Sequence, residues 1–197
     1  MSDPLPADAR LRLALDDARA AATPALALRI LDDAVVEAPA LAQAATLHHA
    51  RASLLMALGR VDDAVAAATR TVELAPGVPD LATNLGATLL QRFRLHGDVA
   101  DLAGARAVLD EAVGLGPRTP AVRATLALVL QLQGQAAAAV AVCDDNLRAF
   151  PADAPTAFNR AAALQALGRT SDARAALQAL APTFPPARTA LDRLPTG

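Results

Sequence analysis

The chain has 197 residues, a formal net charge of −2 and 54% hydrophobic residues. Its 18 basic residues are all arginines, and they are scattered among acidic residues instead of forming a stripe. Since a phosphate backbone is held by such a stripe, we expect no nucleic-acid partner. A single cysteine excludes an internal disulfide and suits a reducing compartment, so we expect a cytoplasmic protein.

The composition favours helices along the whole chain. Alanine, the best helix former, is abundant, and the alternation of β-branched residues that marks strands is missing. The opening residues, MSDPLPADAR, lack the basic and apolar regions of a signal peptide, so we expect none. Thr23 and Pro24 mark a helix start as N-cap and first helical residue. The expected helices span residues 7–21, 24–38, 40–58, 61–75, 80–96, 99–115, 119–133, 136–149, 154–167, 170–181 and 186–194, and residues 39–44 lengthen the third.

The expected helices form pairs that repeat along the chain. Each pair ends at a proline, and the last two intervals between these prolines are 34 residues each. A small residue recurs in the first helix of four pairs and an alanine in every second helix, which lets the paired backbones approach closely. A glycine suited to a left-handed cap ends three of the first helices. The prolines are Pro39, Pro76, Pro117, Pro151 and Pro185, and the small residues of the first helices are Ala52, Gly86, Ala127 and Ala161. The alanines of the second helices are Ala27, Ala64, Ala105, Ala139 and Ala173, and the glycines are Gly59, Gly134 and Gly168.

A period of 34 residues with two helices per unit resembles the tetratricopeptide repeat (TPR). The resemblance implies an all-α fold, a right-handed α-solenoid of about five TPR helix-turn-helix units with a C-terminal capping helix. The chain would then be a single TPR solenoid domain over residues 1–197. Its units would span about 7–39, 40–76, 79–117, 119–151 and 153–185, and the capping helix 186–194.

The third unit departs from this period, because seven residues are inserted within residues 91–101. The segment carries Arg92-Phe93, Gly97-Asp98 and Asp101-Leu102. In these residues it resembles the longer TPR units of actinobacterial proteins that often also carry a CHAT-type protease domain. The resemblance implies a bacterial lineage and no activity.

One uncharged segment, residues 124–143, has the length of a membrane span. Three glutamines and Gly134 lie near its centre, where each would be costly in hydrocarbon, and the repeat register continues through it. We therefore expect two helices joined at Gly134, the first opened by Thr119 as N-cap and Pro120, and no membrane partner.

The side chains that could carry chemistry fit structural roles better. Cys143 occupies an apolar position equivalent to Leu109 and Leu177, so we expect an inert core residue. His48 and His49 point about 100° apart on a helix, whereas a metal site needs three or four converging groups. The aspartate pairs at 16–17, 32–33, 62–63 and 144–145 fit helix starts and solvated faces. The sequence thus predicts no enzyme, no metal and no cofactor.

The TPR resemblance also implies a concave groove, lined by the first helix of each unit, in which partners bind. Asn84 and Asn159 occupy the asparagine positions of TPR co-chaperones, but His49, Ala121 and Thr125 replace the cationic residues that clamp a carboxylate. An apolar or helical ligand is therefore expected in place of a chaperone tail. The groove positions that the resemblance assigns are Thr46, His49, Ser53, Met56, Asp80, Thr83, Ala87, Leu90, Gln91, Ala121, Ala124, Leu128, Gln131, Phe158, Ala162 and Gln165.

Two functions agree with this pattern. The first is a protein–protein interaction scaffold or adaptor that binds a protein or peptide in its groove. The second is a self-associating structural module, in which apolar edges of the terminal units make a homo-oligomer, or an accessory subunit of a larger actinobacterial system.

Overall fold

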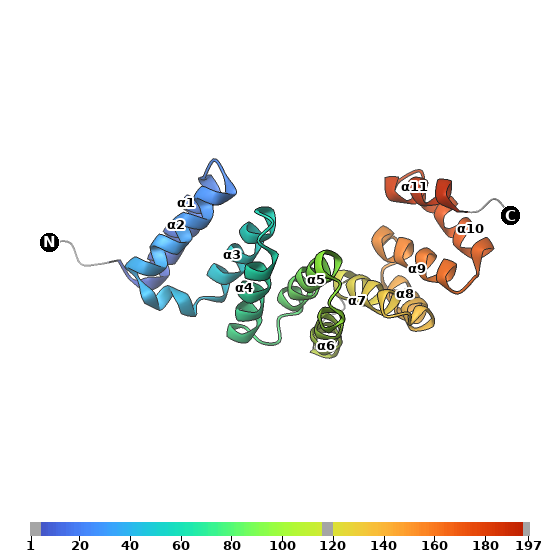
Figure 1. The fold of residues 1–197 in the computed structure, drawn as a ribbon, viewed down its shortest axis with the longest axis horizontal. Helices are drawn as coiled ribbons and strands as arrows, with labels where there is room; N and C mark the ends of the chain where they lie inside the picture. The colour runs from blue at the N-terminus through green and yellow to red at the C-terminus, as the bar shows by residue number, and fades with distance from the viewer. Residues whose placement is uncertain (1–4, 116–119, 195–197) are drawn as a thin grey trace. The chain divides into compact units, whose positions relative to one another are not determined.

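The computed structural model describes residues 5–115 and 120–194, and the regular elements in this part of the chain are all helices (Figure 1). They are α1 (Ala7–Ala20), α2 (Pro24–Glu37), the 3₁₀ helix η1 (Pro39–Gln43), α3 (Ala45–Ala57), α4 (Val61–Leu74), α5 (Pro79–His96), α6 (Val99–Leu115), α7 (Pro120–Leu132), α8 (Ala136–Ala149), α9 (Ala154–Ala166), α10 (Thr170–Leu180) and α11 (Pro185–Arg193). The all-α prediction is confirmed. The right-handed turn of the solenoid and the count of five units stay predictions.

The helices fall into two compact units, Met1–Asp98 and Val99–Gly197. In the first unit α1 packs against α2, α2 against α3, α3 against α4, and α4 against α5. In the second unit α7 packs against α6, α8 and α9, α9 also against α8 and α10, and α10 against α11. The division falls in the turn between α5 and α6, inside the predicted third repeat. The single domain over residues 1–197 stays a prediction.

The ends of several helices are set by residue types that can be read in the sequence. The Thr23 hydroxyl accepts a hydrogen bond from the Leu26 N–H at 3.2 Å and caps α2, as expected. Gly59, Gly134 and Gly168 have φ angles of 72°, 75° and 75°, which confirms the predicted left-handed ends. An added Cβ would meet nothing within 4 Å at any of the three, so the backbone angle requires glycine and the available space does not.

The positions of the repeat pattern form the core of both units. The alanines of the second helices are 0–3% exposed, and the small residues of the first helices are buried as well. Small side chains at these crossings let the helix pairs approach closely, and leucines fill the adjacent space. The largest fully buried side chains include Leu31, Leu47, Leu109, Leu164 and Val129.

The segment before α3 corrects one expectation. Residues 39–44 do not lengthen α3, because Ala44 adopts extended angles of φ −92° and ψ 114° that separate η1 from it. Leu41 is buried at 3% exposure, and the His48 ring nitrogen Nε2 lies 3.0 Å from the Ala42 carbonyl oxygen. These tertiary contacts hold the segment as a separate short helix.

Helix α11 covers apolar side chains at the end of the second unit. Ala187 is fully buried against a cluster that contains Ala161 and Leu177. The rings of Phe158 and Phe184 pack beside this cluster with centroids 5.6 Å apart and planes tilted by 55°. The helix thus buries apolar side chains of α9 and α10, and its role as the cap of the solenoid stays a prediction.

The uncharged segment is divided between two helices, as expected. Helix α7 ends at Leu132, Gly134 turns the chain, and α8 begins at Ala136. Within residues 5–115 and 120–194, none of the helices combines the length and apolar character that a membrane span requires. The expected unit end Pro117 and N-cap Thr119 lie outside the described residues.

Candidate partner-binding groove

A cavity of about 290 Å³ lies between α3, α4 and α5 in the first unit. We call it the α3–α5 groove. It brings together five of the predicted groove residues, which come from α3 and α5. The lining residues are His49, Ala52, Ser53, Met56, Ala68, Thr71, Leu81, Asn84, Ala87, Thr88 and Gln91.

The hydroxyl groups of the groove are already engaged within their own helices. Ser53 donates to the His49 carbonyl at 3.2 Å, Thr71 to the Ala67 carbonyl at 2.9 Å, and Thr88 to the Asn84 carbonyl at 2.7 Å. Their protons are therefore committed to the helix backbone. Thr71 and Thr88 are also buried, so among these oxygens it is that of the exposed Ser53 whose lone pair a ligand could use.

Three other polar side chains differ from these hydroxyls. In the described part of the chain, the side chains of His49, Asn84 and Gln91 have no hydrogen-bond partner. Each offers both donors and acceptors to a ligand. They line the same cavity, and this is the arrangement that a polar ligand backbone needs.

The rest of the groove is small or apolar and carries no formal charge. Met56 and Leu81 are its large apolar side chains, and alanines from all three helices leave room beside them. Methionine adapts to ligands of different shape because its side chain is unbranched and flexible. A neutral lining also means that ionic attraction contributes little to binding here.

The other predicted residues of the first unit lie outside this cavity. Thr46 and Asp80 are exposed, and the half-buried Thr83 donates its hydroxyl to the Pro79 carbonyl at 2.8 Å. Leu90 is only 4% exposed, so it packs in the core and its side chain cannot reach a ligand.

The predicted residues of the second unit are not gathered in the same way. Ala124 is 8% exposed and therefore belongs to the core, and the ring of Phe158 packs against Phe184. Asn159 donates its side-chain amide to the Ala124 carbonyl at 2.9 Å and ties α9 to α7. The remaining predicted residues are partly or fully exposed: Ala121, Leu128, Gln131, Ala162 and Gln165. A cavity of about 270 Å³ in this unit, which includes Val113, Arg123 and Asp145, contains none of them.

Asn84 and Leu81 line the α3–α5 groove but are not among the groove positions that the resemblance assigns. Both lie on the face of α5 that carries Ala87 and Gln91, since residues three, four and seven apart share a helix face. That spacing is the signal available in the sequence. The sequence does not show that Asn84 lines a cavity while Asn159 bonds to the Ala124 carbonyl, because this difference depends on which helix packs beside each asparagine.

The groups considered for catalysis have structural surroundings. Cys143 is fully buried, and burial, followed by the negative charge of Asp144, raises the pKa of its thiol to about 12. The thiol is therefore protonated near neutral pH and is a poor nucleophile. Among the residues with described positions, no group of three or more His, Cys, Asp or Glu could hold a metal ion.

The aspartate pairs take part in local ion pairs. Asp16 pairs with Arg19 at 2.9 Å, and Asp63 pairs with Arg60 at 2.7 Å, both on exposed helix surfaces. Asp62 is 3.7 Å from Arg92 and links α4 to α5. These contacts agree with the expected solvated faces.

No protein-family model matches the sequence, and no curated protein is similar to it. Solved structures do match. A thermophilic TPR protein of Thermus thermophilus has a TM-score of 0.69 at 22% identity, over 94% of this chain and 96% of that chain. YrrB, described as a TPR protein with an unusual peptide-binding site, has a TM-score of 0.69 at 17% identity, over 92% and 89%. MamA has a TM-score of 0.70 at 15% identity, over 87% and 90%.

These likenesses confirm the resemblance that the repeat pattern indicated. The chain has the fold of tetratricopeptide-repeat proteins. Because 168 solved chains match, the likeness is to a widespread architecture and selects no single activity.

Proposed function

We propose that this protein is a non-enzymatic interaction scaffold, an adaptor that binds an extended segment of a partner protein in the α3–α5 groove. The observation that carries the proposal is the convergence of His49, Asn84 and Gln91, without partners of their own, on an apolar floor. The similarity to TPR proteins, among them one with a peptide-binding site, supports it.

The spacing of the free amides favours an extended ligand. Asn84 and Gln91 are seven residues apart on α5, which corresponds to about 10.5 Å along a helix. Three residues of an extended polyproline II chain cover about 9 Å, and its three-residue period returns backbone groups to the same side. The two amides can therefore bond to backbone groups three residues apart, and Met56 and Leu81 can take an apolar side chain between them. A cytoplasmic location belongs to this proposal, as the single cysteine suits a reducing compartment.

The test is affinity capture from a lysate of the native host with three baits. The wild type is compared with Ala87→Arg, which places a long charged side chain in the groove at an exposed helical position. Ala66→Arg on α4 is the matched control, because Ala66 is also exposed but lines a different cavity with His48 and Arg51. Circular dichroism checks that all three are equally helical.

A protein retained by the wild type and Ala66→Arg, and lost with Ala87→Arg, supports binding in the groove. The same protein retained equally by all three baits would place the contact elsewhere on the surface and reject the groove. Loss of the captured protein with both Ala87→Arg and Ala66→Arg would also reject binding in the groove. The loss would then occur whether or not the substitution lies in the groove.

A further inference from the structure

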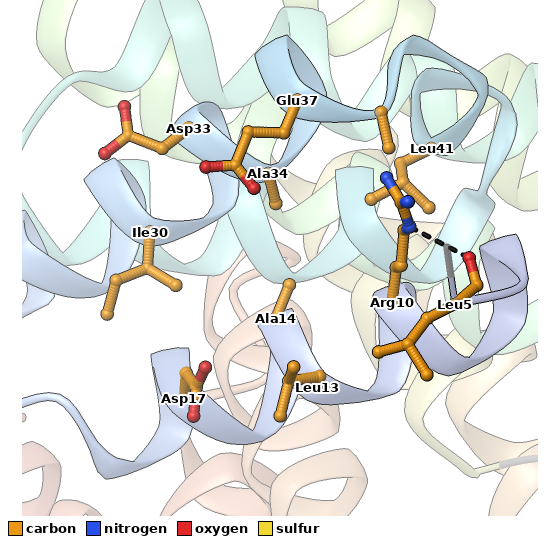
Figure 2. A pocket seen from close by; sticks show the side chains of 11 residues that line it. Leu5, Arg10, Leu13, Ala14, Asp17, Ile30, Asp33, Ala34, Glu37 and Leu41 are labelled. Carbon is orange, nitrogen blue, oxygen red and sulfur yellow. Dashed lines mark hydrogen bonds between the residues drawn. The ribbon is translucent and has the colours of Figure 1, made fainter. Parts of the chain in front are cut away.

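A second and larger cavity, of about 490 Å³, lies between α1 and α2 (Figure 2). We call it the N-terminal pocket. Its floor is formed by apolar side chains of both helices and of η1, including Ala14, Ile30, Ala34 and Leu41. Two further leucines, Leu5 and Leu13, line it while each remains 54% exposed. The pocket therefore presents apolar surface that the first unit itself leaves uncovered.

The rim of this pocket is acidic. Asp17, Asp33 and Glu37 line it, and Arg10 is the one cationic residue among the lining side chains. Figure 2 shows Asp17 and Asp33 toward one end of the pocket, and Arg10 at the other end beside Leu5. There the Arg10 Nε donates to the Leu5 carbonyl at 2.9 Å.

The carboxylates of the rim are not neutralised by neighbours. Asp17 and Glu37 take part in no ion pair in the described part of the chain. Asp33 lies 3.7 Å from Arg29, but both side chains are more than half exposed, so water screens this pair. The lining thus has a net formal charge of −2, from three carboxylates and one guanidinium.

The position of the pocket explains why it is open. No residue of α3 lines it, so it lies on surface of the α1–α2 hairpin that α3 does not cover. This uncovered surface is apolar within an acidic rim.

We propose that the N-terminal pocket is a second binding site, which takes a basic peptide segment of another protein. An apolar side chain of that segment contacts the floor at Ile30 and Ala34, and flanking Lys or Arg residues pair with Asp17 and Glu37. Charge complementarity selects this occupant. A second copy of the chain, joined through the same face, would bring two acidic rims together, and like charges in contact oppose association.

The experiment uses the full chain and a fluorescent peptide, about twelve residues long, of leucine and lysine. Two control peptides replace lysine by glutamate or leucine by serine. The double variant Asp17→Asn/Glu37→Gln removes the unpaired carboxylates of the rim. Its matched control, Glu73→Gln/Glu111→Gln, changes the net charge equally at positions outside the pocket. Binding is followed by fluorescence anisotropy, and its position by the methyl resonances of Leu13 and Ile30.

The expected result is binding of the leucine–lysine peptide only, with shifts of the Leu13 and Ile30 methyl groups. Affinity should fall roughly fivefold in the rim variant and stay unchanged in the control variant, as expected for the loss of two partly exposed ion pairs. Equal binding by both double variants, or shifts at Met56 and Leu81 in place of the pocket methyls, would overturn the proposal. The proposal would also be overturned if light scattering found a dimer that Asp17→Asn/Glu37→Gln strengthens. The pocket would then be the contact surface between two copies of the chain.

Discussion

At the scale of single residues, one buried asparagine joins three helices of the second unit. Asn146 on α8 is 1% exposed, and its amide donates to the Thr156 hydroxyl at 2.6 Å and to the Pro120 carbonyl at 3.2 Å. Thr156 belongs to α9 and Pro120 to α7. These directional contacts help to fix how the three helices meet.

We predict that Asn146→Ala lowers the free energy of unfolding by about 2 kcal/mol, since it removes both hydrogen bonds and leaves the buried Thr156 hydroxyl without this partner. Urea denaturation followed by circular dichroism measures the change. Asn84→Ala is the control: its amide has no partner, so stability should change by less than about 0.5 kcal/mol, while partner binding falls. Equal stability of the two variants would mean that the Asn146 contacts contribute nothing.

The buried thiol gives a second prediction at this scale. Because the folded-state pKa of Cys143 is raised to about 12 from 9.0, the folded chain keeps its proton at a pH where the unfolded chain loses it. The resulting stabilisation is present below pH 9.0 and is lost as the pH rises from there toward 12. A disulfide reagent at about pH 8 should thus modify Cys143 slowly in buffer and rapidly in urea. Fast modification of the native chain would show that the thiol is reachable without unfolding.

At the scale of elements, the turn between α7 and α8 depends on one backbone angle. Gly134 has a φ of 75°, a conformation that costs a residue with a Cβ about 1 kcal/mol or more. Gly114, near the end of α6, has no positive φ. We predict that Gly134→Ala lowers the melting temperature, whereas Gly114→Ala raises it slightly through better helix propensity. Thermal melts followed by circular dichroism measure the change in melting temperature of each variant. A lower melting temperature for Gly114→Ala as well would mean that contacts of the added methyl group, and not helix propensity, determine the effect there.

The helix pairs could be predicted because their signals are local. The small residues and the left-handed glycines recur from pair to pair, and Thr23 and Pro24 mark the start of one helix. The short helix η1 could not, since residues 40–44 are good helix formers and nothing in their sequence marks the break at Ala44. For the candidate groove, positions on one face of α3 and α5 were predictable. The burial of Leu90, and the engagement of Asn159 with α7, depend on neighbouring helices that local pattern does not describe.

At the scale of the whole molecule, the two proposed sites differ in charge and therefore in their response to salt. The α3–α5 groove is neutral, and the N-terminal pocket has an acidic rim. Raising the ionic strength should weaken the binding of a basic peptide to the N-terminal pocket and leave the affinity of the α3–α5 groove for its ligand nearly unchanged. The two sites can thus be separated in one protein without a substitution.

The small net charge bears on self-association, the alternative to an adaptor role. The chain carries −2 at pH 7 and has three histidines and a pI near 5.9, so its mutual repulsion disappears on mild acidification. We predict that light scattering reports rising association near pH 5.9 that reverses at about pH 8, because solubility is lowest where net charge vanishes. Association of fixed stoichiometry that persists at the higher pH would contradict this and would favour a specific homo-oligomer. A monomer at both pH values would instead show that the exposed apolar side chains, among them Val36 and Val99, are too dispersed to associate even without repulsion.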